Sequence, residues 1–223
     1  KGMHYEINYD ISRFLNASMD KVVHTLFEAF ILVALVVFIF LGDWRSALIP
    51  ILSVPVSLIG TFSVMMAFGI TLNMISLFAL VMAIGIVVDD AIIVIENVER
   101  ILRKEAISVK EATIKAMKEI TAPVLAIVLV LSAVFIPAAF MGGLSGTMSR
   151  QFAITIVISV VISGMVALTL TPALCAIFLK KQEPKPFWFV KKFNEFFDAS
   201  TNWFTSGVSL VVRHGVISLI VFA

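Results

Sequence analysis

Charge is scarce in this 223-residue chain: 14% of the residues are Asp, Glu, Lys or Arg, against roughly 25% in soluble globular domains. Hydrophobic residues make up 60%, and the mean hydropathy is +1.05. A soluble globular domain is therefore excluded, and a formal net charge of +2 is too small to indicate a nucleic-acid-binding protein. The alternating pattern of a membrane barrel is also absent, which leaves helices that cross a membrane.

Cysteine and histidine are scarce as well. A single cysteine, Cys175, excludes an intrachain disulfide, and His4, His24 and His214 do not cluster as metal ligands would. The start of the chain, KGMHYEINYD, is polar and has no signal peptide, and the end, HGVISLIVFA, stops a short way into an apolar run. We therefore expect an internal segment of a larger membrane protein.

Five apolar runs are long enough to cross a hydrocarbon core of about 30 Å as helices. They predict transmembrane spans at about 22–41, 47–68, 73–96, 121–140 and 151–179. Residues 1–21 are predicted to lie outside the bilayer as the end of a folded domain, and 207–223 begin a further, truncated span. The predicted fold is an all-α membrane protein with a bundle of five transmembrane helices.

The connections between the spans carry most of the charge. Residues 97–120 mix charges at helical spacing and predict a solvated or interfacial helix, with Ser108 and Glu111 matching a capping box. After a linker at 180–187 that contains two prolines, residues 188–206 place phenylalanines on one face and predict an amphipathic interfacial helix. A soluble packing helix is the alternative for this segment.

Lysine and arginine fall mainly on one side of the predicted spans. If the chain starts outside, the loops at 42–46, 97–120 and 180–214 contain 13 of the 17 Lys and Arg residues. The positive-inside rule then makes these loops cytoplasmic and the N-terminal segment periplasmic or extracellular.

Two adjacent acids, Asp89 and Asp90, interrupt the third apolar run. Ionising an acid in hydrocarbon is costly, and ionisable groups within spans commonly mark ion pathways or proton relays, so we predict a proton relay here. Adjacent helical residues point about 100° apart, so the two acids are expected to face different neighbours. The alternative is that the span ends near Val88 and the acids lie at the membrane interface.

Other polar or small residues give weaker signals. Gly85, one turn before Asp89, is expected to let another helix approach closely. Glu28 in the first span is either a second acid of the pathway or a group that snorkels or pairs locally. Glu96 and Asn97 are candidates for a supporting role. Hydroxyl groups within the spans are expected mostly to bond their own backbone or neighbouring helices, and they belong to Ser132, Thr155, Ser159, Ser163, Thr169 and Thr171.

Several motifs resemble those of resistance-nodulation-division (RND) transporters, in particular their drug and hydrophobe efflux branch. The resemblance covers essentially the whole chain and rests on FLGDWRSALIPILSVPVSLIGTF at 40–62, GIVVDDAIIVIENVER at 85–100, LSAVFIPAAFMGG at 131–143, RQFAITIVIS at 150–159 and LTPALCA at 170–176. It implies the second to sixth spans, the interfacial helix and the start of the seventh span of a twelve-span protomer. Such a protomer works as a trimer in the bacterial inner membrane.

The same resemblance implies that Asp89 and Asp90 are relay aspartates, with protons as the coupling ion and no other cofactor. Their partner would be a lysine on the tenth span, outside this chain. It further implies a secondary transporter, not an enzyme, that exports hydrophobic or amphiphilic drugs bound by periplasmic domains, together with a periplasmic adaptor protein and an outer-membrane channel.

Two other functions are alternatives. A secretion accessory or lipid exporter of the same superfamily would use the same proton site for other cargo. An intramembrane aspartyl protease needs two carboxylates that face each other across a water, which neighbours on one helix cannot do.

Overall fold

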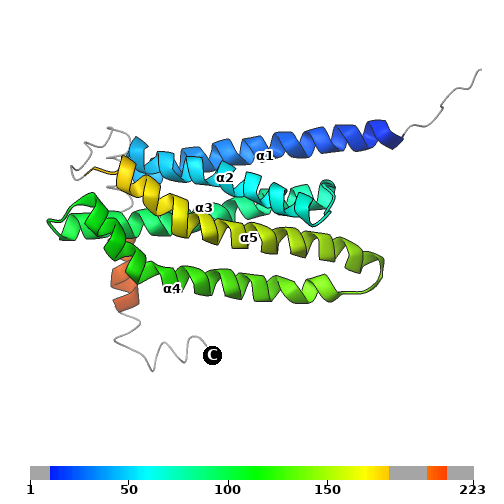
Figure 1. Ribbon diagram of the computed structural model, residues 1–223. Coiled ribbons are helices and arrows are strands. Elements are labelled where there is room, and N and C mark those ends of the chain that lie inside the picture. Colours follow the sequence, from blue (N-terminus) through cyan, green and yellow to red (C-terminus); the bar gives the residue numbers. More distant parts are fainter. Residues whose placement is uncertain (1–10, 181–199, 210–223) are drawn as a thin grey trace, which may run out of the picture. The chain divides into compact units, whose positions relative to one another are not determined.

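Five long helices dominate the computed structural model, which describes residues 11–180 and 200–209 (Figure 1). They are α1 (Ile11–Leu41), α2 (Trp44–Ala67), α3 (Met74–Lys104), α4 (Val109–Phe135) and α5 (Gly143–Phe178), and a short 3-10 helix, η1 (Ile136–Phe140), follows α4. Each long helix contains a stretch long and apolar enough to cross a membrane. No strand occurs in the described residues, and the predicted all-α fold with five spans is confirmed.

The helices α3 and α5 form the centre of this bundle. α3 packs against all four other long helices, and α5 packs against α2, α3 and α4. Figure 1 shows α5 running between α2 and α4. Apolar side chains of α3 such as Leu80 and Ile84 are buried as a result, whereas α1 and α4 keep exposed apolar faces that include Leu32 and Leu129. In a membrane, such faces meet lipid or further helices rather than water.

Local caps and turns start the helices. The Asn73 side chain caps α3 by accepting from the backbone N–H groups of Ile75 and Ser76 at 2.9 and 3.0 Å. The predicted capping box of Ser108 and Glu111 starts α4 and is confirmed. Between α1 and α2, Gly42 has φ of 66°, a left-handed conformation that favours glycine.

The stretch 97–120 differs from the single interfacial helix that its charges predict. α3 continues through Lys104 and α4 begins at Val109, so this stretch is divided between the ends of two long helices. The reason is the apolar face beneath the charges: Val98, Ile101 and Ala116 are buried in one cluster. Packing between α3 and α4 therefore extends both helices beyond their apolar runs.

Some predicted segments lie outside the described residues. Positions 1–10, 181–199 and 210–223 include the start of the polar lead-in, the linker with most of the predicted interfacial helix, and most of the truncated span. Residues 200–209 form a helix that is exposed along its length and belongs to a separate compact unit. The amphipathic helix at 188–206 therefore stays a prediction.

Close helix contacts occur at two glycines, but not at Gly85. A Cβ built on Gly60 of α2 would lie 2.8 Å from Ile162 Cγ2 of α5, and one built on Gly164 of α5 would lie 2.5 Å from Val128 Cγ2 of α4. At Gly85 nothing lies within 4 Å of such a Cβ. No described helix approaches Gly85, because its side of α3 is open. Its predicted role in the approach of another helix therefore stays a prediction.

Gly164→Ala and Gly85→Ala make a matched pair of substitutions in helix interiors. Both gain helix propensity, but only Gly164→Ala forces a methyl group against Val128, and overpacking of this kind costs about 1–3 kcal/mol. We expect Gly164→Ala to be less stable than Gly85→Ala by that amount when this chain is unfolded by denaturant in mixed micelles. Equal unfolding midpoints would contradict the tight contact between α4 and α5.

Candidate functional site

Asp89 and Asp90 lie in the middle of α3. Asp89 is the midpoint of Met74–Lys104, about 22 Å from either end of the helix at ~1.5 Å per residue. α3 continues as a helix past Val88 to Lys104, so the acids are placed within the length of a long helix, not at its terminus. The interfacial alternative concerns where the membrane ends, not where the helix ends, so the placement of the acids within the membrane stays a prediction.

The two carboxyl groups face different surroundings, as the step of about 100° between neighbours predicts. Asp90 is 2% exposed, whereas Asp89 is exposed. Among the ion pairs of the described residues, none includes either acid. Asp90 is thus an acid inside this bundle, and Asp89 is an acid on its surface.

A serine of another helix bonds to Asp90. Ser163 of α5, which is 1% exposed, donates from Oγ to Asp90 Oδ2 at 2.6 Å. The same Oγ lies 3.5 Å from the carbonyl oxygen of Val87, slightly less than one turn before Asp90 on α3. Hydrogen bonds to an ionised group are shorter and stronger than neutral ones. This contact links the middle of α3 to the middle of α5.

Sequence reasoning did not single out Ser163, since it belongs to a set of hydroxyls expected mostly to bond their own backbone or neighbouring helices. Thr155 and Ser159 bond their own helix, donating to the carbonyl oxygens of Gln151 and Thr155 at 2.8 Å each. Ser163 continues the same four-residue spacing along α5, so no local signal separates it from them. Only the packing of α5 against α3 gives it a carboxylate as its partner.

Glu28 forms a local pair. Its Oε1 lies 3.1 Å from Nδ1 of His24, one turn earlier on α1, and both side chains are mostly exposed. Local pairing was one of the alternatives for Glu28, and the structure contains that pair. A role as a second relay acid stays a prediction.

Asn97 belongs to a polar cluster that joins α3 to α4. Its Nδ2 donates to the carbonyl oxygen of Ala116 at 3.3 Å, and its Oδ1 accepts from Arg100 Nε at 2.9 Å. Arg100 also pairs with Glu119 of α4. Glu96, beside Asn97, is exposed. The cluster begins about two turns beyond the acids and fastens the α3–α4 hairpin.

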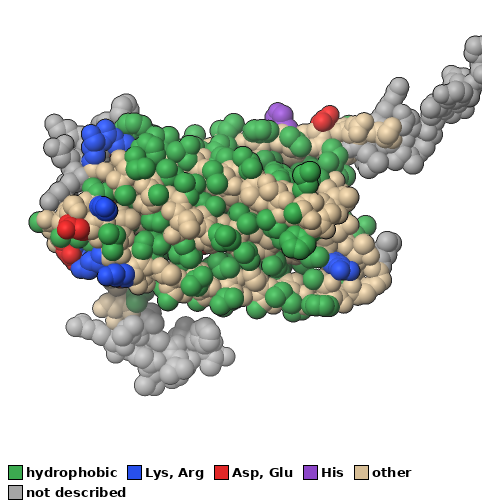
Figure 2. Space-filling view, viewed as in Figure 1, with side chains coloured by type: hydrophobic (Ala, Val, Ile, Leu, Met, Phe, Trp, Pro, Cys, Tyr) green, Lys and Arg blue, Asp and Glu red, His purple; other side chains and the backbone are tan. Residues whose placement is uncertain are grey.

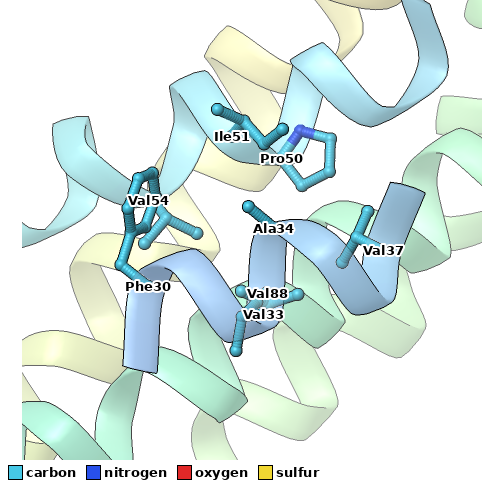
Figure 3. A pocket seen from close by; sticks show the side chains of 8 residues that line it. All are labelled: Phe30, Val33, Ala34, Val37, Pro50, Ile51, Val54 and Val88. Atoms are coloured by element: carbon cyan, nitrogen blue, oxygen red, sulfur yellow. The ribbon is translucent and has the colours of Figure 1, made fainter. Parts of the chain in front are cut away.

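An apolar pocket lies between α1 and α2 (Figure 3). Its lining comes from α1 between Phe30 and Val37, from α2 between Pro50 and Val54, and from Val88 of α3. None of these side chains donates or accepts a hydrogen bond, so the pocket is not a site for a proton or an ion.

Charged side chains gather at one end of the bundle, as Figure 2 shows. Ser46 at the start of α2 bonds to Glu99 near the end of α3, so the α1–α2 and α3–α4 connections lie at that same end. The basic residues of this end include Arg45, Arg100 and Arg103. The grouping agrees with the assignment of loops 42–46 and 97–120 to one side of the membrane.

Comparison with known proteins decides the family. The model of the AcrB/AcrD/AcrF family matches residues 1–223, which is the whole chain. This chain belongs to that family. The resemblance to RND multidrug efflux transporters, inferred from the motifs, is therefore confirmed.

Relatives of this RND chain include multidrug export protein AcrF of Escherichia coli, 45% identical over 100% of the chain. Toluene efflux pump membrane transporter TtgE of Pseudomonas putida is 45% identical over 96%, and multidrug resistance protein MdtF of Escherichia coli is 44% identical over 92%. The chain spans only 20–22% of the length of these relatives. With five helices apolar enough to cross a membrane, it is a multi-pass membrane segment. These relatives are named an export protein, an efflux pump membrane transporter and a resistance protein, which agrees with the predicted transporter.

The bond between Asp90 and Ser163 makes a prediction about stability. Ser163→Ala leaves a buried carboxyl group without its donor, so we expect a loss of about 1–3 kcal/mol. Ser159→Ala, one turn earlier, removes only a bond to its own helix and is the matched control. Unfolding in detergent, alone and combined with Asp90→Asn, should give a coupling energy of about 1 kcal/mol for the 163–90 pair and near zero for 159–90. Equal coupling in both pairs would contradict a direct bond.

The α3–α4 cluster makes a second prediction. Asn97→Ala removes two contacts within the hairpin and should lower the free energy of unfolding by about 1–2 kcal/mol, since the partners lose their hydrogen bonds. Glu96→Gln, at the exposed neighbouring position, should leave it within about 0.5 kcal/mol. Thermal unfolding of both variants in detergent measures the difference. An Asn97→Ala variant as stable as Glu96→Gln would show that the Asn97 contacts do not stabilise the α3–α4 hairpin.

Proposed function

We propose that this chain is the transmembrane segment of a proton-driven multidrug efflux pump, in which Asp89 and Asp90 take up and release the coupling protons. The observation that carries the proposal is the buried Asp90, held by Ser163 in the middle of α3 beside the exposed Asp89. Intramembrane acids placed in this way commonly belong to proton relays. The names of the relatives, among them a multidrug export protein and a toluene efflux pump, support hydrophobic molecules as cargo.

Most of such a pump lies outside this chain. We infer a location in the inner membrane, with the N-terminal end in the periplasm and the α3–α4 hairpin in the cytoplasm, which the gathering of Lys and Arg at the hairpin end supports. The exposed Asp89 faces away from the described helices and is available to a lysine of another span. Drug-binding periplasmic domains, a homotrimer, an adaptor protein and an outer-membrane channel complete the proposal.

The coupling step is a change of charge on α3. Ionised aspartates hold the lysine of the missing span, and protonation removes the negative charge that maintains this pairing. α3 is then free to shift, which makes it a two-state element biased by a local charge change. Because α3 packs against α1, the shift is passed through α1 and residues 1–21 toward the periplasmic domains.

A pair of acids suits the energy that this shift requires. One charge that crosses 100 mV provides about 2.3 kcal/mol, whereas moving a two-state equilibrium from 1:99 to 99:1 needs about 5.5 kcal/mol. A single proton therefore supplies less than half of the requirement at that potential. Two protons, taken up by two acids at one level of α3, supply most of it.

A secretion accessory or lipid exporter is the alternative function within the superfamily, because it would use the same two acids. Cargo is chosen by domains outside this chain. The names of the relatives favour efflux of drugs and solvents.

Substitution of the acids in the full-length protein tests the proposal. Asp89→Asn and Asp90→Asn should each reduce export of a fluorescent drug from energised cells to the level of cells without the pump, since neither amide can release a proton. Glu96→Gln, which neutralises an exposed acid on the same helix, is the matched control and should export normally at equal expression.

Normal drug export by either Asn variant would overturn the proton-relay role. Absence of drug export by the wild type, together with proton-dependent transport of lipid in reconstituted vesicles, would replace the drug cargo by the lipid alternative and keep the proton site.

A further inference from the structure

Hydroxyl groups line the face of α2 that packs against α5. The buried polar side chains of α2 are those of Ser46, Ser53, Ser57 and Thr61, each no more than 1% exposed. Their spacing of seven, four and four residues places them on one side of the helix. Serine and threonine often fasten helices together in membranes, so a hydroxyl-lined face alone indicates only packing.

Two contacts fix the register between α2 and α5, which run in opposite directions side by side (Figure 1). Ser53 Oγ lies 3.3 Å from Thr171 Oγ1, and Gly60 lies against Ile162. Steps of four residues from Ser53 and Thr171 then place Thr61 level with Ser163. We call this contact region, from Ser46 to Thr61 on α2 and from Ser163 to Cys175 on α5, the α2–α5 seam.

Ser57 carries the hydroxyl of the seam that has no partner among the described residues. By the same register it lies level with Ala167 of α5, which offers only a methyl group. The Ser57 Oγ is buried and forms no hydrogen bond within the part of the chain that the structure describes. An unsatisfied buried hydroxyl costs about 1–3 kcal/mol, and such groups in folded proteins are commonly satisfied by buried water. The Ser57 hydroxyl therefore points to water within the seam.

Both ends of the seam meet a carboxylate of α3. At the middle of the bundle, Ser163 bonds to Asp90. At the hairpin end, Ser46 Oγ donates to Glu99 Oε1 at 2.5 Å. Asp90 and Glu99 are separated by about 13.5 Å along α3, so they lie at two different depths of the bundle.

The charged groups around Glu99 come from α3 and from the connection between α1 and α2. Arg103 Nη2 lies 3.8 Å from Glu99 Oε2. Asp43 Oδ2 lies 3.4 Å from Ser46 Oγ, the same oxygen that donates a hydrogen bond to Glu99. Glu96 is the other acid that acts on Glu99 through its charge. Glu99 is about one-fifth exposed, so it connects the buried seam with the surroundings of the hairpin end.

The protic groups of the seam recur at intervals of about one helical turn. Four helical residues rise about 6 Å, and two O–H···O bonds through one water reach at most about 5.5 Å, so more than one water is needed between successive levels. Protic groups occur level by level: Ser163 with Thr61, then Ser57, then Ser53 with Thr171, then Cys175, and finally Ser46 with Glu99. The Cys175 thiol is buried and is the weakest donor and acceptor of this set.

We propose that the α2–α5 seam holds water and is the route by which protons leave Asp90 for Glu99 and the hairpin end of the bundle. This inference rests on the proposed proton relay. Along the route, each oxygen or thiol accepts one proton from one side and gives up another on the opposite side. One proton leaves the Asp90 carboxyl group, and one proton is released from Glu99 to water. Every group between them ends with the same number of protons as it had before.

Proton flux through the full-length protein in proteoliposomes tests the route. An imposed pH gradient drives the flux, which a pH-sensitive dye inside the vesicles reports. Ser57→Val removes the hydroxyl that binds water and fills its space, so flux should fall by about 10-fold to 100-fold, near the low end of what a positioned proton-transfer group contributes. Ser57→Thr keeps the hydroxyl and should retain most of the flux.

Two serines serve as matched controls. Ser63 lies on the exposed face of α2 and donates to the carbonyl oxygen of Ile59. Ser132 of α4 has a buried hydroxyl without a hydrogen bond in the described residues but lies off the seam. Ser63→Ala and Ser132→Ala should both leave the flux unchanged. At the far end of the route, Glu99→Gln should reduce the flux.

The outcomes separate the seam from the proposed function. Normal flux in Ser57→Val, with flux abolished in Asp90→Asn, would contradict the proton route through the seam but not the proton relay at Asp90. Normal flux in Asp90→Asn would overturn the relay itself. If Ser57→Val does not fold, a density map of the wild-type protein that resolves water decides: water bonded to Ser57 Oγ supports the route, and a dry seam contradicts it.

Discussion

A carboxyl group buried among apolar helices is the constraint on which this structure depends. Asp90 is almost fully buried in a bundle whose other buried side chains are apolar, hydroxyl-bearing or, at Cys175, a thiol, and Ser163 is the side chain of α5 that bonds to it. An acid in such a place costs free energy unless it is hydrogen-bonded. Asp90 lies in the middle of α3, where α3 packs against α5. A change of its charge therefore acts on both helices.

Small residues bring α5 close to its other neighbours, α2 and α4. Gly60 and Gly164 bring α5 against α2 and α4, and the hydroxyl side chains along α5 add little bulk of their own. By contrast, the hairpin end is fastened by polar contacts, with Asn97 and Arg100 joined to α4 and Glu99 joined to α2. The bundle thus combines close apolar packing around the acids with a polar network at one end, and Asp89 faces outward from it.

The order of the helices and the acids could be predicted from sequence because both are local signals. Apolar run length predicted five spans, the Ser108–Glu111 spacing predicted a helix start, and two adjacent acids in an apolar run predicted different surroundings for each. The tertiary contacts could not be predicted in this way. Gly85 and Gly164 are both helical glycines, and Ser159 and Ser163 are both buried serines of one stripe, yet only the register between helices decides which glycine is crowded and which serine meets Asp90.

Charge patterns misled for a related reason. Residues 97–120 look like one solvated helix because the charges recur at helical spacing, but the apolar residues between them pack α3 on α4, and the helices continue through the stretch. The spacing of charged residues indicates which side of a helix faces water, but it does not indicate where the helix ends.

Infrared spectroscopy of the full-length protein tests the central claim most directly, because it detects the protonated carboxyl group itself. A pH-induced difference spectrum should contain a carboxyl C=O band that disappears in Asp90→Asn and changes frequency in Ser163→Ala, while Ser159→Ala leaves it in place. A band that survives Asp90→Asn unchanged would show that Asp90 does not take up the proton, and the account of this site would be wrong.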